Sequence, residues 1–296
     1  MKKIMVFTHY DLDGCVSYLT AKWALSKSSV EVEPLPSSGT RERLKRWMTK
    51  HDFSDYDTVY FLDLDVADQF DLIDLPNVVV IDHHKSHEDK QFYKKATAVV
   101  KEYSSAAMLC YRYFRKMINA EYTPEQKALI VLADDYDSYT HKFPDSRILN
   151  DVFWEQQHSF DTFAEQFKNG FSGFTKQQLA VHELKIKELN RLFSSLKMFR
   201  AKNVNVGGVK SDVVATFASS FLNDICDHLI DKEKADVAIV INMDAQRVSF
   251  RRSKKSQAKL NEFAEEIADG GGHEYSAGGS LTPDFMEFTK KLVPYE

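Results

Sequence analysis

Three short apolar segments of this chain are each followed within four residues by an aspartate, and this pattern limits the possible folds more than any other feature of the sequence. The segments cover residues 4–7, 59–62 and 78–81, and stretches with helical spacing, such as 14–25 and 105–117, separate them. Continuous apolar strands that alternate with helices are typical of a parallel sheet covered on both faces. The sequence therefore predicts an α/β fold with a parallel sheet in the first 140 residues.

Carboxylates and imidazoles follow these three strands directly. In chain order they are His9, Asp11, Asp13, Asp63, Asp65, Asp82, His83 and His84. Ligands of parallel α/β sheets bind beyond the carboxyl ends of the strands, so we expect these side chains to converge in one crevice. A further acidic cluster closes a helical stretch that starts near Thr123, and it consists of Asp134, Asp135 and Asp137.

Such a set of side chains indicates a metal site. Several carboxylates in one crevice raise each other's pKa values unless a cation neutralises them. Imidazoles among carboxylates favour a first-row transition metal, whereas oxygen ligands alone favour magnesium or calcium. An aspartate after a strand is by itself often only a helix cap. Four or more aspartates with two histidines supply enough ligands for two metals, the usual arrangement in phosphatases and nucleases.

Composition excludes several classes of protein. The net charge of -5 is not that of a general polyanion binder. No apolar run approaches the roughly 18 residues that span a bilayer, and the N-terminus reads as a strand and not as a signal peptide. The three cysteines, Cys15, Cys110 and Cys226, are far apart and lack metal-ligand spacing. They predict reduced thiols and a cytoplasmic location. The lack of a long apolar run predicts no membrane association.

A second domain is expected in the last third of the chain. Apolar residues recur with helical spacing over residues 175–199, and strand-like and helical segments then start again near residue 204. We therefore expect a smaller α/β domain joined to the first by a helical connector. The expected boundaries are 1–174 for the first domain, 175–200 for the connecting helix and 201–296 for the second domain.

The second domain carries groups that are suited to phosphate. Ser249 and Arg251 lie on an expected strand, and a helical segment then leads to Gly270-Gly271-Gly272-His273 and to Ala277-Gly278-Gly279. Consecutive glycines let backbone N–H groups approach an anion, and a neighbouring arginine and histidine can bind phosphate. A glycine run alone is equally consistent with a flexible turn, and the basic residues 251–255 with a solvated face.

The order of these residues resembles that of a known family. His9-x-Asp11-x-Asp13-Gly14, Asp63, Asp82-His83-His84 and Asp135 are similar to the four motifs of the DHH phosphoesterases. This family includes RecJ-type exonucleases, oligoribonucleases that also dephosphorylate adenosine 3′,5′-bisphosphate, cyclic-dinucleotide phosphodiesterases and some pyrophosphatases. The later Ser-x-Arg, Gly-Gly-Gly-His and Ala-Gly-Gly segments resemble the DHH-associated substrate-binding domain, with Asp269 in place of its first glycine.

The resemblance implies a role for each motif residue. The implied manganese ligands, which could also hold magnesium or cobalt, are His9, Asp11, Asp13, Asp63, His83 and Asp135. Asp63 would bridge two ions, Asp82 would orient His83, and His84 would face the substrate phosphate or the leaving group. His9 stands two residues before Asp11, a spacing close to the RecJ-like form, in which an aspartate replaces this histidine. Among Asp134, Asp135 and Asp137, Asp135 is favoured because Asp135-x-Asp137-x-Tyr139 resembles the Asp-x-Asp-x-Trp form of some members.

These features together predict a manganese-dependent phosphodiesterase of the exonuclease or oligoribonuclease kind. It would hydrolyse short oligonucleotides or dinucleotides by two-metal activation of water. The implied substrate-binding residues in the second domain are Ser249, Arg251, Gly271, Gly272 and His273. The alternatives are a phosphomonoesterase that acts on adenosine 3′,5′-bisphosphate and, in a different class, a nucleotide-binding protein without activity.

Overall fold

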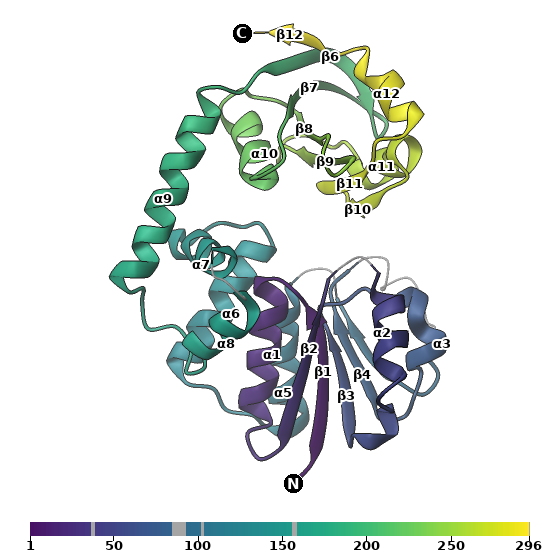
Figure 1. Cartoon of the computed structure of the whole chain (residues 1–296), viewed down its shortest axis with the longest axis vertical. Helices are drawn as coiled ribbons and strands as arrows, with labels where there is room; N and C mark the ends of the chain where they lie inside the picture. The colour runs from purple at the N-terminus through teal and green to yellow at the C-terminus, as the bar shows by residue number, and fades with distance from the viewer. Residues whose placement is uncertain (37–38, 85–92, 102–103, 156–158, 296) are drawn as a thin grey trace. The chain divides into compact units, whose positions relative to one another are not determined.

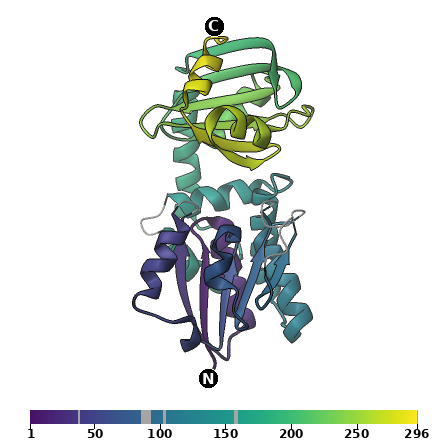
Figure 2. The same ribbon diagram turned by 90° about the vertical axis from the view of Figure 1, so that its right-hand side faces the viewer.

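Two compact units make up the protein, Met1–Glu183 and Leu184–Glu296. The computed structural model describes residues 1–36, 39–84, 93–101, 104–155 and 159–295. Each unit contains its own β-sheet with helices packed on it (Figures 1 and 2). The predicted α/β class, with a parallel sheet followed by a second α/β domain, is confirmed.

A five-stranded parallel sheet forms the centre of the first unit. Its strand order is β2-β1-β3-β4-β5, and every neighbouring pair runs in the same direction. The strands are β1 (Lys3–His9), β2 (Ser29–Leu35), β3 (Thr58–Leu62), β4 (Val78–Asp82) and β5 (Thr97–Val100). All five residues of β4 are buried, as expected for an inner strand made almost entirely of β-branched residues.

Helices cover both faces of this sheet, so alternate residues of each strand enter two different cores. Ile4 and Val6 face the core formed with α1, α5 and α6, whereas Met5 and Phe7 face the core that includes Leu44 of α2 (Figure 1). The helices of this unit are α1 (Leu12–Ala24), α2 (Thr40–Met48), α3 (Phe70–Ile73), α5 (Ala106–Ile118), α6 (Pro124–Asp137), α7 (Pro144–Trp154) and α8 (Ser159–Gln166), with short 3₁₀ helices at Phe53–Asp55 and Ala67–Gln69.

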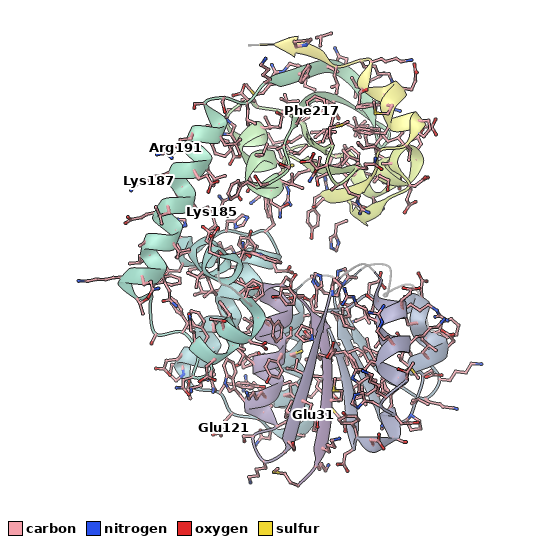
Figure 3. The ribbon with its side chains drawn as sticks, viewed as in Figure 1. Glu31, Glu121, Lys185, Lys187, Arg191 and Phe217 are labelled. Carbon is pink, nitrogen blue, oxygen red and sulfur yellow. The ribbon has the colours of Figure 1, made fainter. Side chains whose placement is uncertain are left out.

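The two edge strands, β2 and β5, were not expected from the sequence. In β2 the acidic Glu31 and Glu33 alternate with half-buried valines, and Pro34 interrupts the pattern. Charges and proline are tolerated at a sheet edge because one side of the strand has no partner to bond. Glu31 marks this edge in Figure 3. The apolar-run criterion therefore finds the inner strands and overlooks the edges.

The second unit has a seven-stranded mixed sheet in the order β10-β11-β9-β8-β7-β6-β12, in which β7 and β8 pair in parallel. Its strands are β6 (Met198–Val206), β7 (Val209–Phe217), β8 (Val237–Asn242), β9 (Arg247–Arg252), β10 (Gly271–His273), β11 (Ser276–Ser280) and β12 (Val293–Tyr295), and its helices α10 (Leu222–Asp231), α11 (Leu260–Ala268) and α12 (Pro283–Thr289). Val214 packs with α10 on one face, whereas Val213 packs with α11 and α12 on the other.

Helix α9 (Lys176–Phe193) is shorter than the expected connector over 175–200. The last apolar residues of the expected connector have another role, because Met198 and Phe199 belong to β6 and pair with β7 and β12. The boundary between the two units falls inside this helix. Of the helices that the structure describes, α9 included, none combines the length and the apolar character needed to cross a membrane.

Candidate metal centre

The carboxyl ends of β1, β3 and β4 lie next to one another. In the register of the sheet Thr8 is opposite Leu62, and Leu62 is opposite Ile81. The backbone N–H of Asp63 donates to the carbonyl of Ile81 over 3.0 Å. Hence the polar residues that follow the three strands begin at the same level, as the parallel arrangement predicts.

Asp63 occupies the middle of this edge. His83 Nε2 lies 3.2 Å from its Oδ1, and His9 Nδ1 lies 3.8 Å from its Oδ2. The side chain is buried, and its backbone adopts the left-handed conformation with φ of +57°. Aspartate and asparagine tolerate this conformation better than most residues do. Its position is therefore that of a carboxylate held between two imidazoles.

The first motif supplies two carboxylates from the start of α1. Asp11 caps this helix, accepting from the N–H of Gly14 over 2.9 Å, and its Oδ2 lies 2.8 Å from His9 Nδ1. Gly14 is required because a Cβ atom there would lie 2.1 Å from the carbonyl oxygen of His9. Asp13 accepts from the N–H groups of Ala106 and Ala107 at the start of α5, at 2.7 and 3.0 Å. Both carboxylates are thus fixed by helix N-termini.

Three groups of side chains bring possible ligand atoms within 4.8 Å of one another. They are His9-Asp11-Asp63, Asp63-His83-His84 and Asp13-His83-Asp137. Asp63 and His83 each belong to two groups, so the three groups form one continuous cluster. The structure therefore brings together five of the six expected metal ligands, His9, Asp11, Asp13, Asp63 and His83, and it adds His84 and Asp137.

The pKa values of three aspartates in this cluster are raised because the side chains are buried close to one another. Burial, followed by the nearby carboxylates, raises the pKa of Asp63 well above its ordinary value. Burial and Asp137 raise the pKa of Asp13 to about 8. Burial also raises the pKa of Asp137, although His83 opposes that shift. Ionised carboxylates this close together are costly unless a cation lies between them.

Two buried oxygen atoms show where a cation would fit. Among the residues that the structure describes, Asp63 Oδ2 and Asp137 Oδ2 are buried and have no hydrogen-bond partner. Unsatisfied buried carboxylate oxygens are rare because each costs free energy. Combined with imidazole nitrogens, they form a donor set that suits a divalent cation. The residues present therefore fit a divalent metal centre.

Of the three acidic residues considered for the fourth motif, Asp137 belongs to one of the three groups, and the expected Asp135 does not. Asp135 lies outside all three groups, because its carboxylate accepts hydrogen bonds from Thr140 Oγ1, Ser146 Oγ and the N–H groups of Lys142 and Phe143. On an α-helix, two residues that are two positions apart are separated by about 200° around the helix axis, so their side chains lie on nearly opposite faces. Asp137 therefore faces the cluster, whereas Asp135 binds the segment that leads into α7 through these hydrogen bonds.

Asp82 also has a different partner from the one expected. Its Oδ1 lies 2.7 Å from His84 Nδ1, and its Oδ2 accepts from the N–H of His84 over 3.3 Å. His83 instead places Nδ1 3.6 Å from Asp137 Oδ2. The carboxylate of Asp82, buried at the end of β4, thus orients His84 rather than His83.

The expected substrate-binding residues of the second unit lie on strands. Ser249 and Arg251 share the face of β9 opposite Phe250, and Arg251 Nη2 donates to Asn223 Oδ1 on α10 over 3.0 Å. Gly271, Gly272 and His273 form the edge strand β10, which pairs with β11. The ring of His273 stacks on Tyr275, with ring centroids 5.2 Å apart.

Glycines in this part of the second unit permit close packing of strands. A Cβ atom at Gly270 would lie 2.0 Å from the carbonyl oxygen of Gly278, and Gly272 has a φ of +135°. Backbone geometry therefore requires glycine at positions 270 and 272 independently of any ligand, whereas a Cβ atom at Gly271 would meet open space.

Comparison with protein families finds one match in each unit. Residues 3–134 match the model of the DHH family N-terminal domain, and residues 202–293 match that of the DHHA1 domain. None of the curated proteins searched matches the chain.

Three solved structures illustrate the fold. A structure described as the DHH domain of a member of a family of ribosomal proteins has a TM-score of 0.65 and 15% identity, with 98% of this chain and 85% of that chain covered. The complex of RecJ with Mn2+ from Thermus thermophilus has a TM-score of 0.57 and 12% identity. The match covers 98% of this chain and 51% of that chain, so the chain spans about half of that protein. The pGpG-specific phosphodiesterase PggH from Vibrio has a TM-score of 0.54 and 10% identity, with 98% of this chain and 97% of that chain covered. At these identities the likeness shows the fold.

Proposed function

Since the chain carries a DHH family N-terminal domain followed by a DHHA1 domain, we propose that it is a divalent-metal-dependent phosphodiesterase of short oligonucleotides or dinucleotides. One observation carries this proposal: buried carboxylates with raised pKa values surround imidazoles at the ends of three parallel strands. The neighbours described as the exonuclease RecJ and the pGpG-specific phosphodiesterase PggH support the substrate class.

The metal ligands would be His9, Asp11, Asp13, Asp63, His83 and Asp137. Two manganese ions, or magnesium or cobalt in their place, would activate water and stabilise the charge that develops on the phosphoryl oxygens. Asp63 is suited to contact both ions because it belongs to two of the three ligand groups. Asp13 is suited to a fixed ligand role because two backbone N–H groups hold its carboxylate.

His84 is suited to proton transfer at the leaving group. Burial lowers its pKa, but Asp82 more than compensates, so the pKa of His84 is raised above its ordinary value. The bond between Nδ1 and Asp82 fixes the imidazole ring, and a protonated imidazole can donate a proton to the leaving oxygen. In this proposal Asp82 is a positioning residue that acts through His84.

A substrate panel tests the proposed function. The chelated protein, with and without added Mn2+, would be given dinucleotides, short RNA and DNA, cyclic dinucleotides, adenosine 3′,5′-bisphosphate and pyrophosphate, and the products would be resolved. We expect turnover of linear dinucleotides only when metal is present. Preferred hydrolysis of the bisphosphate would indicate a phosphomonoesterase, and binding without turnover of any ester would indicate a nucleotide-binding protein.

We expect Arg251→Ala to lower kcat/KM for dinucleotides by roughly ten- to a hundredfold. A guanidinium can bind a phosphate with two charge-assisted hydrogen bonds, and a contact of this kind is worth about 1.5–3 kcal/mol. Hydrolysis of bis-p-nitrophenyl phosphate, which has no second phosphate, would be affected much less. Arg251→Lys, which keeps the charge but not the paired geometry, would lie between the two. Equal losses on both substrates would place Arg251 at the chemical step.

A further inference from the structure

Helix α7 presents a row of side chains to residues that directly neighbour the candidate metal ligands. Asn150 Nδ2 donates to the hydroxyl of Tyr136 over 2.8 Å, and Tyr136 precedes Asp137 in the chain. One turn further along α7, the ring of Trp154 lies 6.4 Å from that of Tyr10, measured between centroids. Residues four apart share one face of a helix. This face of α7 therefore contacts Tyr136 and Tyr10, which neighbour candidate ligands in two different segments.

Trp154 is fixed beside the first metal-binding motif. Tyr10, whose ring it contacts, stands between His9 and Asp11 in the chain. Tyr10 is itself held in place, because its hydroxyl accepts from Ser159 Oγ over 3.0 Å. Phe153 packs edge-on against the Trp154 indole, with centroids 5.1 Å apart and planes at 85°. The indole is therefore positioned by neighbouring rings rather than free to turn.

Yet Trp154 is the most exposed tryptophan of the chain, with 52% of its surface open to solvent. The other two tryptophans have clear structural roles. Trp23 donates its indole N–H to the carbonyl of Lys168 over 2.6 Å, and Trp47 stacks on Phe53 at 5.4 Å. Within the described residues the indole N–H of Trp154 has no hydrogen-bond partner. An aromatic side chain that is both positioned and exposed beside a charged centre is suited to binding a flat ligand.

We propose that the exposed face of Trp154 is a stacking platform for a nucleobase whose phosphate group lies at the metal centre. This inference rests on the proposed function and specifies where the base of its nucleotide substrate binds. Stacking on an indole accepts every base, because each base has a π-face, so the platform favours nucleotides without strong sequence preference. The carboxylate cluster cannot supply this selectivity, because it offers no group that distinguishes a base from any other substituent on a phosphate.

Fluorescence provides a test that needs no hydrolysis. With three tryptophans in the chain, the exposed Trp154 dominates the part of the emission that a bound ligand can change. In the presence of Mg2+, titration with adenosine 5′-monophosphate should quench the wild-type protein, and Trp154→Phe should lose most of that quenching. Ribose 5-phosphate, which keeps the phosphate and lacks the base, should leave the emission unchanged. Equal quenching by both ligands, or undiminished quenching in the variant, would overturn the proposal.

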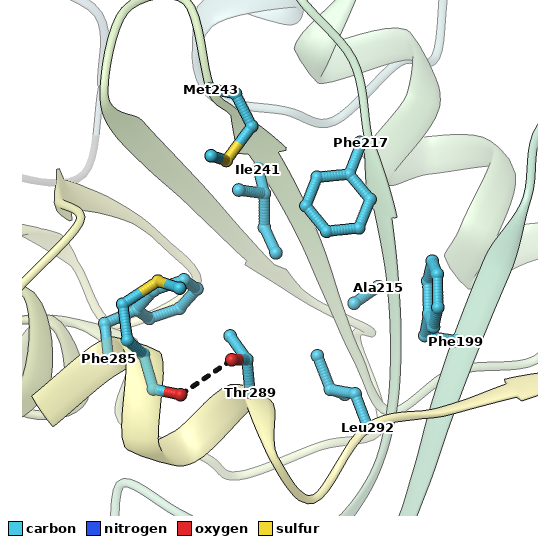
Figure 4. Close-up of a pocket in the computed structure, with 9 residues that line it drawn as sticks. Phe199, Ala215, Phe217, Ile241, Met243, Phe285, Thr289 and Leu292 are labelled. Atoms are coloured by element: carbon cyan, nitrogen blue, oxygen red, sulfur yellow. Dashed lines mark hydrogen bonds between the residues drawn. The ribbon is translucent and has the colours of Figure 1, made fainter. Parts of the chain in front are cut away.

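Kinetics provide the second test. Trp154→Ala should raise KM for a dinucleotide about five- to a hundredfold with little change in kcat, and Trp154→Phe should restore most of the loss because a smaller ring remains. Phe217→Ala is a matched control, since Phe217 is 50% exposed in the second unit (Figure 3). That ring borders an apolar pocket that contains no ionisable side chain among its lining residues (Figure 4). The control should leave KM unchanged.

The two arms separate this inference from the proposed function. Base-dependent quenching without turnover would retain the platform and reject the phosphodiesterase. Metal-dependent turnover with an unchanged KM in Trp154→Ala would retain the enzyme and reject the platform. An equal rise of KM in Trp154→Ala and Phe217→Ala would also reject it, because the effect would then come from general loss of apolar surface.

Discussion

Asp63→Asn is expected to lower kcat/KM on dinucleotides by about a thousandfold or more while the fold remains intact. The carboxylate belongs to two of the three ligand groups, so its loss would weaken the binding of both ions. A metal ion contributes several kcal/mol of transition-state stabilisation, and about 4 kcal/mol corresponds to a thousandfold in rate. Asparagine has nearly the same shape and tolerates the left-handed backbone at this position.

The same substitution should not destabilise the metal-free protein. Burial and neighbouring carboxylates raise the pKa of Asp63, which means that its ionised form is unfavourable without a cation. A neutral amide removes that cost, so the Tm of the chelated variant should equal or exceed that of the chelated wild type. Calorimetry with and without Mn2+ measures this directly, and a large loss of Tm in chelator would show that Asp63 has a structural role instead.

The second large effect distinguishes two neighbouring aspartates. Asp137→Asn should lower activity about a hundred- to a thousandfold and weaken Mn2+ binding, since Asp137 Oδ2 is a buried oxygen of the cluster without a hydrogen-bond partner in the described chain. Asp135→Asn should instead destabilise the protein. Its carboxylate accepts from Thr140, Ser146, Lys142 and Phe143, and an amide cannot accept on both of its terminal atoms.

For Asp135→Asn we expect the free energy of unfolding to fall by about 2–4 kcal/mol, because hydrogen bonds to charged groups contribute about 1.5–3 kcal/mol each. Urea denaturation in chelator measures this loss, and Mn2+ titration at a temperature where both variants are folded measures metal affinity. A stable Asp135→Asn variant that binds no metal, together with an active Asp137→Asn variant, would reverse the assignment.

The inner strands and their polar ends could be predicted because parallel strands impose a simple rule. Apolar runs such as 78–81 identify buried strands, and the residues after them must meet at one edge of the sheet. The edge strand β2 was not predicted by this rule because Glu31 and Glu33 interrupt its apolar pattern. An edge strand does not need two covered faces, so its sequence carries a weaker signal.

The details of the site depended on directions that a sequence does not specify. Asp135 and Asp137 are equally acidic and two residues apart, and only the orientation of α6 decides which one faces the cluster. In the same way, the contact of Asp82 with His84 depends on the path of the backbone after β4, which the sequence does not specify. Strand β10 was not predicted because two of its three residues are glycines, and glycine is depleted in strands.

Titration of Mn2+ into the chelated protein, with dinucleotide hydrolysis followed at each addition, tests the central claim most directly. Asp63 and His83 link the three candidate ligand groups of the cluster, to which the proposed function assigns two ions. We therefore expect no turnover without metal and a rise in rate that reaches its plateau at about two equivalents of Mn2+ per chain. Full turnover in chelator, or no turnover at any Mn2+ concentration while the protein remains folded, would contradict the assignment of this cluster as a catalytic metal centre.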